Sequence, residues 1–123
     1  MEESTGETLD GILKQLLAAI PEVKSTAIVS VEGLPIASAL PQGVDETRIA
    51  AMTAAILSLG ERAAHEMSKG DLEQIMVKGT DGYLLVLAAG PNAVLVVSTT
   101  PDVRLGLIFL DCKRTTEKIA KLI

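Results

Sequence analysis

The side chains that could carry out chemistry are few in this sequence. It contains one histidine, His65, and one cysteine, Cys112. Group transfer needs a nucleophile beside a base, and zinc sites need several cysteines or histidines. His65 falls on the polar side of a predicted helix, and Cys112 falls on the apolar stripe of another. We therefore expect no enzyme activity, metal or cofactor, with His65 on the surface and Cys112 as a packing thiol in preference to a redox thiol.

The segment SVEGLPIAS, residues 30–38, raises the question whether its glycine belongs to a phosphate loop. Such a loop has several glycines followed by Lys and Ser or Thr at the start of a helix. Neither that pattern nor GxGxxG occurs in the sequence. Glu32-Gly33 instead predicts a tight turn between two short apolar runs, because such turns need a positive φ. Pro35 cannot donate to a strand ladder, so the second run is predicted to be an edge strand.

The composition of the 123 residues excludes several classes of function. The formal net charge is −5 and only 2% of residues are aromatic, which argues against the basic and aromatic surfaces that bind nucleic acid. The acidic start, MEESTGETLD, is unlike a secretory signal. The longest apolar run, residues 83–98, is broken by Gly90-Pro91-Asn92 and is too short for a transmembrane helix. We expect a cytoplasmic protein with a single domain over residues 1–123.

Hydrophobic periodicity predicts three helices and five strands in this chain. A helix over residues 9–20 follows the capping-box pattern Ser4-x-x-Glu7 and stops at Pro21. A second helix spans residues 45–69 with Asp45 as its N-cap, and a third begins with the cap Thr100-Pro101-Asp102. Strands are predicted over residues 26–31, 34–40, 72–78, 83–89 and 93–99.

The strands are expected to form one antiparallel sheet, because tight turns join several of them. The runs 83–89 and 93–99 are almost continuously apolar, as in central strands covered on both faces, whereas 72–78 alternates and is predicted to be the second edge. Helices must then lie on both faces. The predicted fold class is α+β in the order α-β-β-α-β-β-β-α, with a five-stranded antiparallel sheet between helices in three layers.

The helix over residues 45–69 carries more apolar surface than one sheet can cover. Further apolar or small residues lie on its flank, and small side chains allow a second helix to approach closely. We interpret this flank as a helix-helix seam, in preference to alanines that serve only helix propensity. The face toward the sheet is predicted to carry Ile49, Met52, Ile56, Leu59 and Ala63.

Three segments carry a resemblance to a known family. They are TAIVSVEGLPIASAL, the alanine-rich RIAAMTAAILSLGERAA, and NAVLVVSTTPDVRLGLIFLDCKRTTEKIAKLI, in which Gly106 lies near the start of the last helix. Together with the element order, they resemble the Roadblock family of dynein light chains over about residues 9–119. The resemblance implies a roadblock/profilin-like architecture, with one helix on one face of a five-stranded antiparallel sheet and two on the other. It also implies dimers that pair strand 72–78 and helix 45–69 with their counterparts.

The same resemblance implies a function without shared catalytic residues. Prokaryotic Roadblock members are partners or regulators of small Ras-like GTPases, and eukaryotic members serve motor and nutrient-signalling scaffolds. We therefore expect a non-catalytic homodimeric module that binds and regulates, or scaffolds, a small Ras-like GTPase. The alternative is a small-molecule sensor domain, or a scaffold subunit of a larger assembly without a GTPase. The shortage of aromatic and convergent polar residues on the central strands disfavours the sensor.

Two surfaces are predicted on this basis. The dimer interface joins the flank of the second helix to the edge strand: Ala50, Leu57, Ala64, Ile75 and Val77. The partner-binding platform lies on the outer side of the helix pair: Ala51, Ala54, Ser58, Glu61, Arg62 and His65. A competing docking site is the basic group of the last helix, whose charges would also be favourable at a helix C-terminus without any partner: Lys113, Arg114, Lys118 and Lys121.

Overall fold

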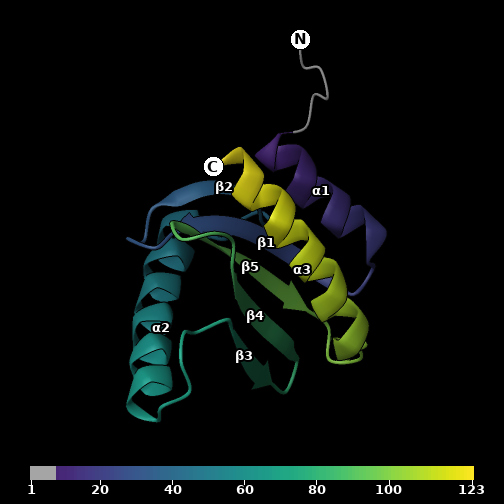
Figure 1. Cartoon of the computed structure of the whole chain (residues 1–123). Helices are drawn as coiled ribbons and strands as arrows, with labels where there is room; N and C mark the ends of the chain where they lie inside the picture. The colour runs from purple at the N-terminus through teal and green to yellow at the C-terminus, as the bar shows by residue number, and fades with distance from the viewer. Residues whose placement is uncertain (1–7) are drawn as a thin grey trace.

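The computed structural model describes residues 8–123, and its helices and strands follow the predicted order (Figure 1). The helices are α1 (Leu9–Ala19), α2 (Glu46–Glu66) and α3 (Leu105–Leu122). The strands are β1 (Val23–Ser30), β2 (Pro35–Ala39), β3 (Gln74–Gly79), β4 (Gly82–Ala88) and β5 (Ala93–Thr99). None of the helices within residues 8–123 is long and apolar enough to cross a membrane.

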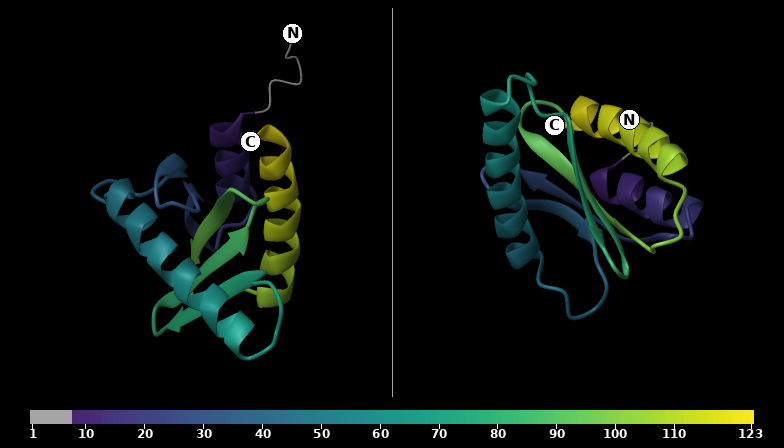
Figure 2. Two further views of the ribbon diagram at one scale, coloured as in Figure 1. Left: turned by 60° about the vertical axis from the view of Figure 1, so that its left-hand side comes forward. Right: turned by 90° about the horizontal axis from the view of Figure 1, so that it is seen from below.

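The five strands form one antiparallel sheet in the order β2-β1-β5-β4-β3. β2 and β3 are its two edges, and β4 and β5 lie inside it, as predicted. Two further views place α1 and α3 on one face of the sheet and α2 on the other (Figure 2). The three-layer α+β architecture expected from the sequence is therefore confirmed.

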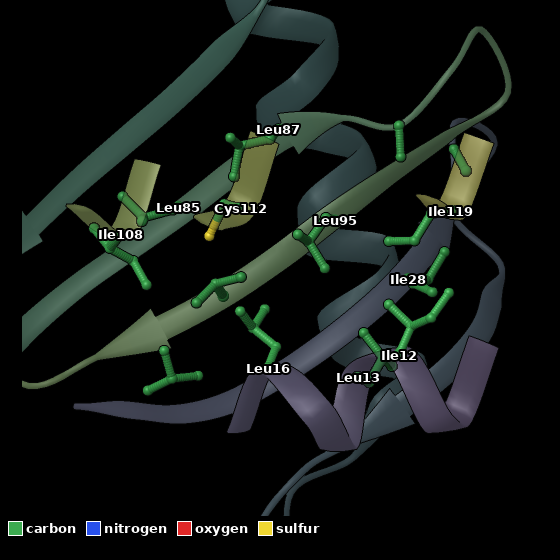
Figure 3. Packing of buried hydrophobic residues seen from close by; sticks show 14 residues of the cluster. Ile12, Leu13, Leu16, Ile28, Leu85, Leu87, Leu95, Ile108, Cys112 and Ile119 are labelled. Atoms are coloured by element: carbon green, nitrogen blue, oxygen red, sulfur yellow. The ribbon is translucent and has the colours of Figure 1, made fainter. Parts of the chain in front are cut away.

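Alternation along the strands divides the interior into two cores, because successive side chains of a strand point to opposite faces. Leu85 and Leu87 of β4 face α1 and α3, where they join Leu13 and Ile108 in the larger core (Figure 3). Val86, between them, faces α2. Both cores are aliphatic, as the scarcity of aromatic residues requires. The smaller core consists of Ala27, Val29, Ala50, Leu57, Val86, Val94 and Val96.

Side-chain caps fix the starts of the first two helices. Thr8 is the N-cap of α1, and its hydroxyl accepts a hydrogen bond from the Gly11 amide at 3.0 Å. The predicted Ser4-x-x-Glu7 box lies outside the described residues. Asp45 is the N-cap of α2, as expected, and its carboxylate accepts from the Thr47 amide at 2.9 Å. Each cap satisfies one of the amides that have no partner in the first turn of a helix.

The predicted start of α3 is wrong by a full turn. Thr100 does not cap a helix: its hydroxyl donates to Asp102, and its amide donates to the Glu22 carbonyl at 2.9 Å. These two bonds hold residues 100–103 as a turn against the connection between α1 and β1. The helix begins at Leu105 instead, with Arg104 as an N-cap that makes no side-chain capping bond.

Gly33 forms the corner between β1 and β2, which confirms the turn predicted from SVEGLPIAS. Its φ is +96°, a left-handed conformation that favours glycine. The Ser30 amide donates to the Leu34 carbonyl at 2.8 Å and closes the turn. A Cβ at Gly33 would lie 3.2 Å from the Cβ of Ala54, so the corner also packs closely on α2.

Thr26 of β1 gives a testable consequence for stability. The residue is fully buried, and its hydroxyl oxygen has no hydrogen-bond partner among the described residues. An unpaired buried polar group costs about 1–3 kcal/mol. We therefore expect Thr26→Val to raise the free energy of unfolding by about 1 kcal/mol, measured by urea denaturation.

Thr53→Val is the matched control for this prediction. Thr53 is also buried, but its hydroxyl donates to the Ile49 carbonyl at 2.7 Å. Removing a satisfied hydroxyl should give little change or a loss of stability. A Thr26→Val protein less stable than the parent would contradict the assignment of an unsatisfied hydroxyl.

Candidate functional site

The face of α2 that meets the sheet is not the predicted one. Ala50 is 0% exposed and Leu57 is 8% exposed, whereas Leu59, expected to face the sheet, is 65% exposed. The predicted seam residues Ala50 and Leu57 are therefore already covered by the sheet, and Ala64 is half-buried. These three residues do not form an outward helix-helix seam. The small side chain of Ala50 lets the helix axis approach the strands, which turns the bulkier residues onto the flank.

The exposed apolar flank of α2 borders strand β3. A Cβ placed at Gly60 would lie 2.9 Å from the Ile75 side chain and 3.1 Å from that of Leu72, so this side of the helix approaches β3. Residues three or four positions away along a helix lie on the same side. Ile56 and Ala63 therefore flank Gly60 and extend the same side. The flank also carries three exposed large side chains, Met52, Leu59 and Met67.

Strand β3 presents an open edge next to this flank. Within residues 8–123 its one hydrogen-bonded neighbour strand is β4, and every residue of β3 except the half-buried Ile75 is exposed. Ile75 and Val77 lie on the α2 side of the sheet, because they pair with Val86 and Leu84. Unpaired strand edges normally carry charges or bulges that prevent association. β3 has one charged residue, Lys78, whose ammonium lies 5.8 Å from the centre of the Tyr83 ring.

We call the surface formed by this helix flank and strand the apolar seam. It contains the two β3 residues that sequence analysis placed in the dimer interface, and two α2 residues, Met52 and Leu59, that it assigned to the sheet-facing side. Met67 was assigned to neither surface. The signal that could have found these α2 residues is the breadth of the apolar stripe, which extends beyond the buried arc of the helix. The apolar seam comprises Met52, Leu59, Met67, Ile75 and Val77.

The predicted partner platform lies on the other flank of α2. Ser58, Glu61, Arg62 and His65 line one shallow hollow of about 430 Å³ together with Glu66. Two exposed polar contacts border it: an ion pair of Arg62 with Glu66 at 3.5 Å and a hydrogen bond between His65 and Asp71 at 3.3 Å. Exposed pairs of this kind contribute little to stability and can exchange for a partner's charges.

The two alanines predicted for the platform differ in their positions. Ala51 is exposed. Ala54 is half-buried and contacts the corner at Gly33, so it lies beneath the β1-β2 turn rather than at the centre of an open surface. A large side chain at Ala54 would displace this turn.

The structure separates the basic residues of α3. Arg114 and Lys118 line a groove between α1 and α3. Lys113 lines a different groove, between α3 and the β3-β4 edge. The four basic residues consequently do not form a single patch on one face. Sequence analysis missed the second groove, because its presence depends on how much of the sheet α3 leaves uncovered.

The nucleophilic and metal-binding chemistry of the described residues is sparse. Cys112 lies on the buried side of α3 and is fully buried (Figure 3). Burial, with a smaller contribution from the charge of Asp111, raises the pKa of its thiol to about 12. The thiol therefore stays protonated near neutral pH and is a poor nucleophile. Within residues 8–123, no group of three or more His, Cys, Asp or Glu side chains is placed to hold a metal ion.

Comparison with known proteins supports one family. The model of the Roadblock/LC7 domain matches residues 9–99. The uncharacterized protein MJ1340 of Methanocaldococcus jannaschii is 43% identical over 97 residues, which cover 79% of this chain and 84% of that protein.

Solved structures show the same fold. The Streptomyces avermitilis Roadblock/LC7 domain has a TM-score of 0.87 at 20% identity, covering 94% of this chain and 98% of its own. Myxococcus xanthus MglB has a TM-score of 0.86 at 23% identity, covering 99% of this chain and 97% of its own. With the edge strand, the covering helices and the sequence match in agreement, the chain belongs to the Roadblock/LC7 domain family.

Proposed function

We propose that this protein is a non-catalytic homodimeric module that binds and regulates a small Ras-like GTPase in the cytoplasm. The observation that carries the proposal is the open edge of β3 beside the apolar seam, in a Roadblock/LC7 domain. Regulation of GTPases is the role that the family resemblance implies for prokaryotic members. The likeness to MglB, at 23% identity, supports the fold on which this role rests.

Pairing of β3 with β3 of a second copy would satisfy both parts of this surface. An antiparallel pair related by a two-fold axis would give each strand edge a backbone partner and extend the sheet across the dimer. Ile75 and Val77 lie on the same face as α2, so the two α2 flanks would approach each other over that face. Met52, Leu59 and Met67 would then leave water, a contribution of the kind that drives most association.

Leu59→Lys tests the dimer. Leu59 is exposed in the single chain, so a lysine there should leave the fold intact while placing a charge in the apolar seam. We expect sedimentation to show a folded monomer, with an unchanged circular dichroism spectrum. The matched control is Ser58→Lys, which places the same charge on the other flank and should stay dimeric. A parent protein that is monomeric at every concentration, or a Leu59→Lys dimer, would contradict the proposed interface.

The platform on α2 is the proposed docking site for the GTPase. In the proposed dimer, the two platforms would lie on either side of the paired α2 helices and would be related by the two-fold axis. Small and charged residues around a shallow hollow are typical of a modest, transient interface. One GTPase lying across the axis would contact both copies and prevent a second from binding in the same way.

Arg62→Ala tests this docking site. It removes a guanidinium that pairs with the exposed Glu66 carboxylate, so stability should change little. We expect weaker binding of the source organism's small Ras-like GTPases, measured by calorimetry with GTP or GDP bound, and one GTPase per dimer by native mass spectrometry. GTP hydrolysis at saturation should fall by much less than the roughly 10³-fold or more that follows loss of an arginine finger.

Arg114→Ala is the comparison variant for the competing site on α3. Arg114 is exposed and lines the groove between α1 and α3, on the other face of the sheet. It should leave GTPase affinity unchanged. Weaker binding by Arg114→Ala but not by Arg62→Ala, together with two GTPases per dimer, would move the docking site to α3.

A further inference from the structure

A groove on the α3 side of the sheet is unused by the function proposed above. It lies between α3 and the start of β3 with the end of β4, and has a volume of about 580 Å³. Leu87 of β4 and Leu72, which lies just before β3, line one side of it, and Phe109 and Leu110 line it from the helix. Leu110 is 47% exposed. Met76, also 47% exposed, lies two residues along β3 from Gln74 on the same face and extends the apolar floor.

Gly106 is a second, independent feature of this groove. It lies in the first turn of α3 and lines the groove wall. A Cβ at this position would meet no atom within 4 Å, and its φ is not positive. Glycine in a helix costs up to about 1 kcal/mol relative to alanine. Nothing in the described residues requires a glycine at this position. A second molecule that approaches the backbone of α3 closely would require one.

The proposed dimer determines the width of the space above β3, and the inference rests on that dimer. α3 contacts β4 and β5, so its axis lies over the line between them. From that line to an axis between the two β3 strands is two strand spacings, or about 10 Å. The two α3 axes would therefore lie about 20 Å apart. Since packed helices lie about 8–10 Å apart, one further helix fits between them.

We propose that this trough, formed by the two grooves and the paired β3 strands, binds one amphipathic helix of a partner polypeptide across the two-fold axis. The partner helix would place an apolar stripe on Met76 and Leu110 of both copies and pass close to both Gly106 backbones. Such stripes have apolar residues at positions i, i+3, i+4 and i+7. The site lies on the opposite face of the sheet from α2 and leaves the GTPase platform free.

The chemistry of the lining favours a helix over a small charged ligand. The charged residues of the groove are Glu73 and Lys113, one of each sign, so the site does not select an anion or a cation. The hydroxyl of Thr116 donates to the Lys113 carbonyl at 2.7 Å, so its proton is already used within the helix. What remains is apolar surface along about two turns of α3, from Gly106 to Lys113.

A displayed library of helical peptides, selected for binding to the purified dimer, tests the proposal. We expect amphipathic sequences with the stripe described above. Calorimetry with a selected synthetic peptide should give one peptide per dimer. Leu110→Glu should weaken its binding at least about tenfold, because the charge lies at the centre of the apolar contact. The matched control, Leu107→Glu, alters a residue that is 56% exposed on the α1 side of the same helix and should bind normally.

Gly106→Ala separates recognition from folding. It should raise the melting temperature, because alanine favours the helix and finds open space, and it should weaken peptide binding at least about threefold by blocking close approach. Sedimentation of each variant reports on the dimer independently. Failure to select any helical peptide, equal binding by Leu110→Glu, or one peptide per chain with the dimer intact would overturn the trough. A monomeric parent protein would instead overturn the dimer on which it rests.

Discussion

The open ladder of β3 is the constraint on which the rest of the structure depends. Three helices cover a five-stranded sheet unevenly: α2 contacts β1 and β2, and α3 contacts β4 and β5. β3 is left at the edge with all but one of its residues exposed. Backbone donors and acceptors along such an edge pair with another strand when one is available. The apolar seam and the groove beside Leu110 both border this strand, on opposite faces of the sheet.

The position of α2 follows from the size of the side chains beneath it. Ala27 of β1 and Ala50 of α2 are both buried in the smaller core, and Gly60 approaches Ile75 closely. These small residues draw the helix near the sheet and fix its rotation about its axis. Because the helix carries a wide apolar stripe, that rotation leaves part of the stripe exposed. The exposed part faces β3, which places the seam beside the open edge.

Much of the fold could be predicted from the sequence, because local patterns determine it. The element order, both edge strands, the corner at Gly33 and the Asp45 cap all follow from periodicity and turn chemistry. The rotation of α2 could not be predicted, since a stripe wider than the buried arc does not say which part meets the sheet. The predicted start of α3 was wrong because the Thr100 amide donates a hydrogen bond to the Glu22 carbonyl, a contact between segments distant in the sequence.

The candidate sites were predicted less completely, for a related reason. Ser58, Glu61, Arg62 and His65 line one hollow, as their spacing along a helix predicts, and their role in partner binding stays a prediction. The groove beneath Leu110 was not predicted, since it exists where α3 ends its cover of the sheet. That boundary is a property of packing between distant segments. Sequence periodicity shows which side of a helix is apolar, but it does not show how far a neighbouring layer extends.

The two proposed binding surfaces would be coupled through one strand without any mobile element. Ile75 and Val77 contribute to the seam on the α2 face, while Gln74 and Met76 belong to the α3 face of the same six-residue strand. Pairing of β3 would therefore complete both surfaces at once, because alternate residues of a strand point to opposite faces. A ligand that binds only the paired form must stabilise the pair. By reciprocity, a helix in the trough would then strengthen GTPase binding wherever dimerisation is incomplete, and would have no such effect where every chain is already paired.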